Sequence, residues 1–389
     1  MFYLKKWRKV GVFICISLSA CTQIDDYLLG KDNTPVPKPL AILKSNIPLK
    51  LDWSVSVGHK TKGLTYLKIS PVVLNNIVYT SDSNGQVEAR DTRQGSLIWS
   101  RKLKHGVLSG PSVAEDGVAL GTDASSVVVL NKSNGNIRWQ SKVSGDVFAQ
   151  PLIMNHSVFV KTVDGTVLSL AMKNGDKQWA LDHGSPQLIL QASSSPVQMG
   201  SQLLVGFSDG QLEAIDQKTG HSDWQRGMMY PRGSSDIERL VDIDADPIVH
   251  QDTVYLASYQ GSVGAWMLAD GQSIWTKPVS VYKNMATDAT NLYMVDRHDT
   301  IWAIDRSNGM IKWKNITLKA RGVTAPVLMD AWLVVGDHTG NLHILDVQTG
   351  NVLARISLRA AIDSSPVVDG HKVYVMTADG QLNRVTVGA

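Results

Sequence analysis

A repeat of about forty residues constrains the fold of this 389-residue chain more than any other feature. Its first marker is a proline, at Pro71, Pro111, Pro151, Pro196, Pro247, Pro326 and Pro366. Its second marker is a tryptophan 28 residues further on, at Trp99, Trp139, Trp179, Trp224 and Trp275, with Trp313 in a unit that has Ala286 in the proline position. A glycine precedes each of these tryptophans by four residues. Such self-similarity is typical of an array of small supersecondary units.

Each unit is predicted to contain four short strands. The second strand is rich in β-branched and aromatic residues, as in Val158-Phe159-Val160, and a turn such as Asp164-Gly165 follows it. No long segment has the 3.6-residue period of a helix. Four-stranded units repeated about every forty residues are typical of a β-propeller. Counting the second and third strands gives eight units, so the sequence predicts an all-β, eight-bladed propeller.

The last unit is incomplete, and the N-terminal part of the chain supplies the missing strand. Pro366 places the next tryptophan beyond the final residue, Ala389, whereas Trp53 lies in a strand-like segment, residues 49–55, that precedes the first unit. We expect this segment to complete the last blade, which closes the ring and removes its free edges. An open solenoid is the alternative, but it gives Trp53 no such role.

The first twenty residues have the pattern of an export signal. A basic segment is followed by eleven apolar residues from Val10 to Ala20, too few to span a membrane, for which about twenty are needed. The sequence Leu18-Ser19-Ala20-Cys21 resembles the bacterial lipobox. That resemblance implies a signal peptide over residues 1–20, a covalent lipid such as palmitate on Cys21, and, with Thr22 next, an outer-membrane anchor facing the periplasm. An ordinary signal with a chance cysteine is the alternative.

Residues 21–48 are polar and contain four prolines, so we expect a flexible tether, with the propeller over residues 49–389. Without residues 1–20, 34 basic residues face 35 acidic ones, which argues against nucleic acid as a partner. Cys15 and Cys21 are the only cysteines, so zinc-finger, Fe–S and disulfide frameworks are excluded from the rest of the chain.

Candidate catalytic and metal-binding groups are incomplete. No serine lies in a G-x-S-x-G motif. The aspartates at 242, 244 and 246 begin like a calcium loop, but Pro247 replaces its glycine and Thr253 its terminal glutamate. His338 and His343 flank a turn in a position that varies among the repeats. We therefore expect no cofactor, no metal and no enzymatic activity.

The repeat resembles that of the quinoprotein dehydrogenases, which use adjacent cysteines that this propeller lacks. The lipobox, the proline-bearing tether, the Asp52–Val55 segment and the eight repeats together resemble the BamB family, the lipoprotein scaffold of the machinery that folds outer-membrane β-barrels. The segment from Ser235 to Asp244 resembles a characteristic loop of that family, with Glu238 and Val241 as departures. The resemblance implies a non-enzymatic scaffold that binds the barrel-forming subunit BamA and assists nascent outer-membrane proteins.

Two insertions locate a candidate partner surface. The segment from tryptophan to the next proline normally spans 12 residues but lengthens to 17 after Trp179 and to 23 after Trp224. Insertions in successive repeats emerge on one face, which is often the binding face. The first insertion carries Leu188-Ile189-Leu190, and the second carries Met228-Met229-Tyr230 and charged residues, a combination typical of protein interfaces.

By the family resemblance, the partner-binding residues are Leu188, Leu190, Gln191, Arg239, Asp242 and Asp244. Gln191 replaces the arginine of the family, and we expect the charged members of this set to be partly exposed rim residues. In the alternative, the leucines pack under their own loop and the charges are merely solvated. A quinoprotein-like enzyme and a scaffold of another envelope complex are the competing functions.

Overall fold

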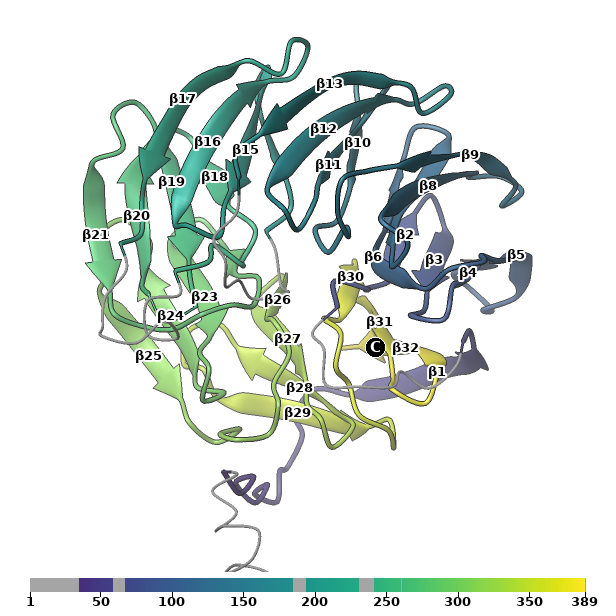
Figure 1. The fold of residues 1–389 in the computed structure, drawn as a ribbon. Coiled ribbons are helices and arrows are strands. Elements are labelled where there is room, and N and C mark those ends of the chain that lie inside the picture. The colour runs from purple at the N-terminus through teal and green to yellow at the C-terminus, as the bar shows by residue number, and fades with distance from the viewer. Residues whose placement is uncertain (1–34, 59–66, 185–193, 231–240, 260, 389) are drawn as a thin grey trace, which may run out of the picture. The chain divides into compact units, whose positions relative to one another are not determined.

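Eight four-stranded antiparallel sheets follow one another around a ring in the computed structural model (Figure 1). The structure describes residues 35–58, 67–184, 194–230, 241–259 and 261–388, and residues 37–389 form one unit. Of residues 1–36, only Pro35 and Val36 are described, and neither is in a strand. The described residues contain no helix, and consequently no helix able to span a membrane. The predicted all-β, eight-bladed propeller is confirmed.

We number the sheets as blades 1 to 8 in chain order. The strands of blades 1 to 4 are β2 (Val72–Leu74), β3 (Ile77–Ser81), β4 (Gln86–Asp91) and β5 (Leu97–Lys102); β6 (Val107–Ala114), β7 (Gly117–Thr122), β8 (Ser126–Asn131) and β9 (Ile137–Lys142); β10 (Leu152–Met154), β11 (Ser157–Lys161), β12 (Thr166–Ala171) and β13 (Lys177–Asp182); and β14 (Val197–Met199), β15 (Gln202–Gly206), β16 (Gln211–Asp216) and β17 (Ser222–Gly227).

The strands of blades 5 to 8 are β18 (Ile248–His250), β19 (Thr253–Ala257), β20 (Val263–Met267) and β21 (Ser273–Lys277); β22 (Ala286–Thr287), β23 (Asn291–Val295), β24 (Ile301–Asp305) and β25 (Ile311–Asn315); β26 (Val327–Met329), β27 (Trp332–Gly336), β28 (Asn341–Asp346) and β29 (Val352–Ser357); and β30 (Val367–Asp369), β31 (Lys372–Met376), β32 (Gln381–Val387) and the N-terminal β1 (Leu49–Ser56).

Strand β1 closes the ring as expected. It pairs antiparallel with β32, from Leu49 opposite Val387 to Ser56 opposite Gln381, and becomes the outer strand of blade 8 (Figure 1). Trp53 takes the tryptophan position of this blade, 6.1 Å from the ring of Tyr374. Its indole Nε1 donates a hydrogen bond to the carbonyl oxygen of Thr92 in blade 1, at 3.1 Å. The two chain ends therefore form one blade and bind the next.

The repeated tryptophans join neighbouring blades through the repeated glycines. In blade 2, Trp139 donates from Nε1 to the carbonyl of Met172 in blade 3, at 3.0 Å, and its ring lies on Gly175. A Cβ added to Gly175 would lie 2.6 Å from that ring, and the φ of this residue is +76°. Only glycine combines this backbone conformation with so close an approach. The same tryptophan-to-glycine contact recurs from Trp53 to Gly95, Trp99 to Gly135, Trp179 to Gly220, Trp275 to Gly309 and Trp313 to Gly350.

The interface between blades 4 and 5 departs from this pattern although its sequence does not. Arg226, rather than Trp224, lies against Gly271. Its guanidinium donates to the carbonyl oxygens of Leu268 and Ala269, at 2.6 and 2.9 Å, and stacks 4.3 Å from the ring centroid of Trp224. A charged residue thus replaces the indole at the blade interface that lies beside the longer of the two insertions.

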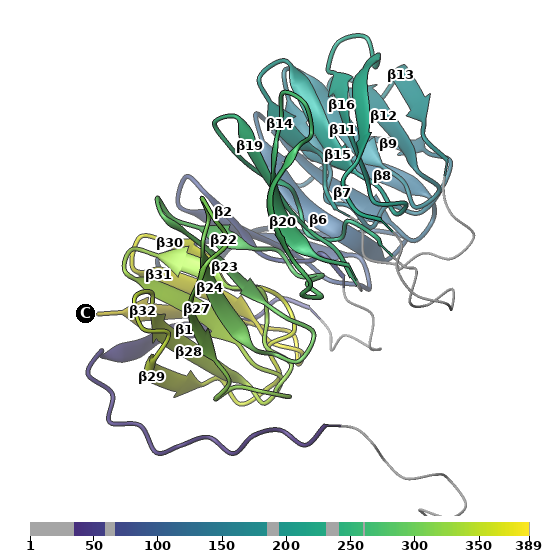
Figure 2. The same ribbon diagram turned by 90° about the vertical axis from the view of Figure 1, so that its left-hand side faces the viewer.

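The described end of the expected tether packs on the propeller. This differs from the expectation of a tether that is flexible as far as residue 48. Lys38 donates its backbone N–H to the carbonyl of Lys319, at 3.1 Å, and Leu40 packs against the apolar cluster of blades 6 and 7. Ile47 is buried in the cluster of blades 7 and 8. Figure 2 shows this segment running past β28 and β29 before it enters β1.

Two glycine substitutions distinguish the energetic cost of overpacking from the cost of an unfavourable backbone conformation. Gly370 also has a positive φ, +54°, but an added Cβ would meet nothing within 4 Å. We expect Gly370→Ala to lower the free energy of unfolding by about 1–2 kcal/mol through backbone strain alone. Gly175→Ala should lower it by roughly 1–3 kcal/mol more, because the methyl group overpacks the Trp139 ring. Equal losses in urea unfolding would contradict this interpretation of the blade interface.

Candidate functional site

The two insertions begin and end on one face of the ring. Each blade is antiparallel, so the segments from a fourth strand to the next first strand lie at the same end of the sheets as the turns between second and third strands. We call this end the connector face. The first long connector, residues 183–196, joins blades 3 and 4, and the second, residues 228–247, joins blades 4 and 5. The described ends of both insertions therefore lie on the same face, at neighbouring blades.

Four of the predicted partner-binding residues, Leu188, Leu190, Gln191 and Arg239, lie outside the described residues. At the start of the second long connector, Met228 and Met229 are buried, and both backbone N–H groups donate to the carbonyl of Gly210 at 3.0 Å. These methionines belong to the core and are not the interface anchors that their sequence suggested. Tyr230, which follows them, is 70% exposed.

Asp242 and Asp244 are buried, with 1% and 0% of their surface exposed, so the expectation of partly exposed rim charges is wrong. The cause is the backbone between them. Ile243 donates its N–H to the carbonyl of Phe207 at 3.2 Å and forms an antiparallel bridge with Ser258. The connector thus enters between blades 4 and 5 like an additional short strand. The alternation of buried Val241, Ile243 and Ala245 is the sequence signal that could have predicted this.

Asp244 is the more unusual of the two aspartates. Neither of its carboxylate oxygens has a hydrogen-bond partner among the described residues, although both are inaccessible to solvent. Burial, and then the nearby charge of Asp242, raise the pKa of Asp244 well above its usual value. The Lys68 and Lys161 ammonium groups act in the opposite direction. This carboxyl group is therefore part of an internal charge cluster and lies away from solvent.

A buried histidine holds the start of the first long connector. His183 stacks on Phe207 with ring centroids 3.6 Å apart, Nδ1 is 2.9 Å from Glu213 Oε2, and Nε2 is 3.1 Å from Asp209 Oδ2. An imidazole with a carboxylate at each nitrogen donates through both and carries a positive charge. Burial alone would lower the pKa of His183, but the two carboxylates outweigh it and raise the pKa to about 9.

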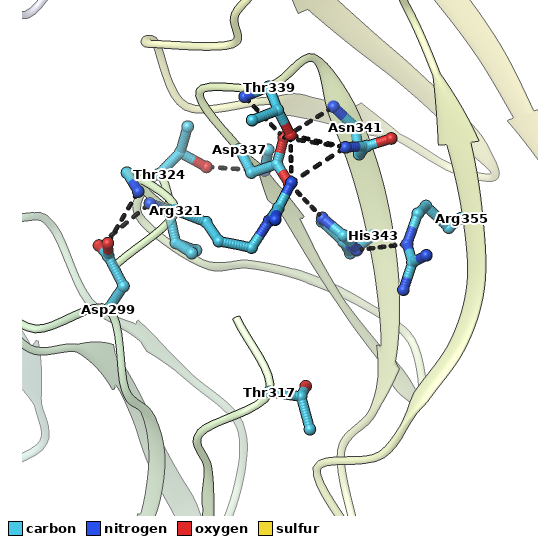
Figure 3. A network of polar contacts seen from close by, with 12 residues as sticks. Asp299, Thr317, Arg321, Thr324, Asp337, Thr339, Asn341, His343 and Arg355 are labelled. Atoms are coloured by element: carbon cyan, nitrogen blue, oxygen red, sulfur yellow. Dashed lines mark hydrogen bonds and ion pairs between the residues drawn. The ribbon is translucent and has the colours of Figure 1, made fainter. Parts of the chain in front are cut away.

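A second polar cluster surrounds Asp337 (Figure 3). The buried Asp337 accepts hydrogen bonds from Arg321 Nε at 2.9 Å and from His343 Nε2 at 3.0 Å. Arg355 Nε donates to His343 Nδ1 at 3.3 Å, so this imidazole is neutral, and burial lowers its pKa. Arg321 and Arg355 also donate to the backbone carbonyls of Lys38 and Ala41, at 2.9 and 3.3 Å. The cluster therefore holds the segment before β1 by its backbone.

The candidate metal ligands do not come together in the described part of the chain, where no three histidine, cysteine or acidic side chains are arranged to hold a metal ion. His343 is bound to Asp337, whereas His338 pairs with Asp363 at 2.7 Å. Asp246, the third aspartate of the calcium-like sequence, is bound to Lys68 at 2.6 Å. A protein cation therefore binds the third carboxylate of the loop that begins like a calcium site.

The fold and the site define a propeller of the quinoprotein-repeat class in which two long connectors between neighbouring blades begin and end on one face. A quinohemoprotein alcohol dehydrogenase from Comamonas testosteroni shares the fold, with a TM-score of 0.70 over 87% of this chain and 76% of that one, at 14% identity. The crystal structure of BamB from Moraxella catarrhalis matches with a TM-score of 0.79 and 25% identity, over 87% of this chain and 100% of that one.

Sequence comparison places the chain within that class. The family profile described as outer membrane protein assembly factor BamB matches residues 52–315 and 317–388. The BamB of Legionella pneumophila strain Paris is 53% identical over 98% of this chain and 100% of the relative, and that of Escherichia coli K12 is 32% identical over 98% and 99%. The chain belongs to the BamB family. These relatives are named as assembly factors, in agreement with the prediction of a protein that is not an enzyme.

The charged His183 predicts a specific dependence of stability on pH. Its pKa in the folded protein, about 9, exceeds the unfolded value of 6.5, so its contribution is complete below pH 6.5 and is lost as the pH rises through 9. We expect the free energy of unfolding to fall by up to about 3 kcal/mol over that window. His183→Gln should abolish this decline, whereas His343→Gln should retain it because His343 is already neutral there. Identical pH profiles for wild type and His183→Gln would contradict the assignment.

Proposed function

We propose that this chain is a non-enzymatic scaffold of the outer-membrane β-barrel assembly complex and docks on BamA through its connector face. Membership of the assembly-factor family supports the general role. The observation that carries the docking site is the emergence of two long connectors from neighbouring blades on one face. Loops held by a rigid scaffold are common binding elements, and their length here exceeds what joining the blades requires.

The apolar residues of the first connector are the proposed anchors. Leu188 and Leu190 supply aliphatic side chains, and the exposed Tyr230 lies at the start of the second connector. Aromatic and aliphatic anchors with a polar rim are typical of protein interfaces. Gln191 provides an amide where the family has a guanidinium, so it can donate hydrogen bonds but cannot form an ion pair. Arg239 is the proposed cation of this surface.

Asp242 and Asp244 take a different role in this proposal. Because both are buried and act through their charge on Lys161, they affect docking through the charge balance at the end of the second connector and do not themselves form the rim of the interface. Nascent outer-membrane proteins are proposed as the cargo that the complex receives. A scaffold of a different envelope complex is the competing function, and the proteins that co-purify with the detergent-solubilised chain distinguish the two.

A lipid on Cys21 is the proposed anchor in the outer membrane, with the propeller in the periplasm. Arg321 holds the chain at Lys38, which lies 17 positions after Cys21. A fully extended segment of that length spans at most about 60 Å. Were the tether free as far as β1, the reach would be more than one and a half times as long. The contacts at Lys38 and Ala41 thus limit how far the propeller can lie from the membrane.

Replacing the proposed leucine anchors tests the docking site. Leu188→Asp with Leu190→Asp should place unpaired charge in the interface and weaken retention of BamA by about 3 kcal/mol, roughly a hundredfold. The matched control is Ile98→Asp with Ile137→Asp, which alters two exposed isoleucines on the outer strands of blades 1 and 2. The measurement is BamA retained by immobilised chain, with circular dichroism to confirm folding. Equal retention by all three proteins would place the docking site elsewhere.

The anchor is tested separately. Cys21→Ser should give an uncleaved precursor that takes up no labelled palmitate, because Cys15 lies within the apolar part of the signal. Cys15→Ser is the control and should be acylated like the wild type. Palmitate on the Cys21→Ser protein would contradict the lipobox assignment.

A further inference from the structure

One lysine connects opposite sides of the ring. Lys68 is fixed at blades 1 and 2, where it forms a parallel bridge with Ser109 and its carbonyl accepts from the N–H of Gly110 at 3.0 Å. Its ammonium group reaches the end of the second long connector, donating to the carbonyl of Asp244 at 3.0 Å and pairing with Asp246 Oδ1 at 2.6 Å. Blade 5 is four blades away from blade 1 in a ring of eight, so this contact crosses the centre of the propeller.

Asp246 binds two further segments at the same point. Its Oδ1 also accepts the backbone N–H of Ser195 at 2.6 Å, and Ser195 lies at the end of the first long connector. Its Oδ2 accepts from Asn284 Nδ2 at 2.8 Å, while its own N–H donates to Asn284 Oδ1 at 2.9 Å. Burial would raise the pKa of Asp246, but Lys68 and these donors hold it below its usual value. One ionised carboxylate thus binds the ends of both long connectors.

A second buried lysine supports this arrangement. Lys161, which is 3% exposed, donates to the carbonyl of Gly206, and the same carbonyl accepts from Ser194 Oγ at 3.0 Å. Burial, and then the charge of Lys68, lower the pKa of Lys161 to about 8, whereas Asp244, Asp242 and Asp246 oppose that shift. Two cations therefore face three aspartates where the connectors end. Removing one cation leaves buried negative charge that is only partly compensated, which is strongly unfavourable.

We propose that Lys68 and Asp246 are positioning residues for docking, which hold the ends of both long connectors in the arrangement that the partner recognises. This inference rests on the proposed docking function and extends it to a residue on the opposite side of the ring. The blades have complete backbone pairing without this ion pair. Its loss therefore opens the connector ends more readily than it unfolds the sheets, because local opening is less costly than global unfolding.

The ring contains a matched ion pair that serves as a control. Lys283 and Asp299 are 3.4 Å apart, with side chains 7% and 11% exposed, and also hold backbone: Asp299 accepts from the N–H groups of Gly322 and Val323. This pair fastens the segment between blades 6 and 7, which carries neither long connector. Lys283→Met thus removes a similar buried cation whose ammonium group binds Asp299 and Val323 and neither long connector, although the adjacent Asn284 binds Asp246.

The experiment measures binding of solubilised BamA to the full-length chain and to Lys68→Met, Lys68→Arg, Asp246→Asn and Lys283→Met. We expect Lys68→Met and Asp246→Asn to weaken binding about 5–150-fold, the usual range for coupling between sites. Lys68→Arg should restore binding by retaining the charge, and Lys283→Met should bind like the wild type even if its melting temperature falls. Equal binding by Lys68→Met and Lys283→Met would overturn the proposal. Should Lys68→Met not fold, Asp246→Asn carries the comparison.

Amide hydrogen exchange provides a measurement that does not depend on BamA. The N–H groups of Ser195 and Ile243 should exchange faster in Lys68→Met than in the wild type and should be unchanged in Lys283→Met. If the wild-type chain does not bind BamA, the docking function fails, and faster exchange at these two amides still supports the connection between the connectors. Unchanged exchange in both variants would overturn the inference that Lys68 holds the ends of the connectors, whatever the chain binds.

Discussion

The contact between a tryptophan of one blade and a glycine of the next is the interaction on which the ring depends. The indole supplies a large apolar surface and one N–H donor, and the next blade supplies a bare backbone and a carbonyl acceptor, as Trp139 and Gly175 do. Because the contact is directional, a blade that makes it determines where its successor lies. Trp53 repeats it between blade 8 and blade 1, so the interface that closes the ring has the same chemistry as five of the others.

Closure by the N-terminal strand also determines where the rest of the chain leaves the propeller. With β1 as the outer strand of blade 8, the preceding segment passes blade 7, where Arg321 and Arg355 hold the carbonyls of Lys38 and Ala41. The same ring places both long connectors at one end of blades 3 to 5. The segment before β1 and the ends of both long connectors are therefore each held on a rigid scaffold by polar side-chain contacts.

The charged groups inside the molecule hold loop segments in place more than they hold the blades together. Asp337 with Arg321 holds the N-terminal segment, His183 with Glu213 holds the start of the first long connector, and Asp246 with Lys68 holds the ends of both. Buried ion pairs contribute little net stability when compared with well-packed apolar residues. They do, however, require particular partners at particular distances. In this protein, we interpret these ion pairs as contacts that fix the positions of segments outside the blades, which the hydrogen bonds of the four-stranded sheets do not hold.

The period of prolines, glycines and tryptophans was enough to predict the number of blades, the four strands of each and the closure by residues 49–55, because these features depend on local patterns that recur. The same pattern did not predict that Arg226 replaces Trp224 at one interface, since both residues lie on one strand and only the neighbouring blade selects between them.

The site was less predictable than the fold. The sequence located both insertions, but charged side chains were expected at the surface. The burial of Asp242 and Asp244 follows from pairing of Ile243 with the two blades that its connector joins. The packed tether was missed for a different reason: its partners are the carbonyls of Lys38 and Ala41, which every residue type possesses. The sequence by itself determined the repeating architecture, because each blade follows local rules. Only the tertiary structure decided which charges are buried and which backbone is held, because those contacts join segments that no pattern along the chain connects.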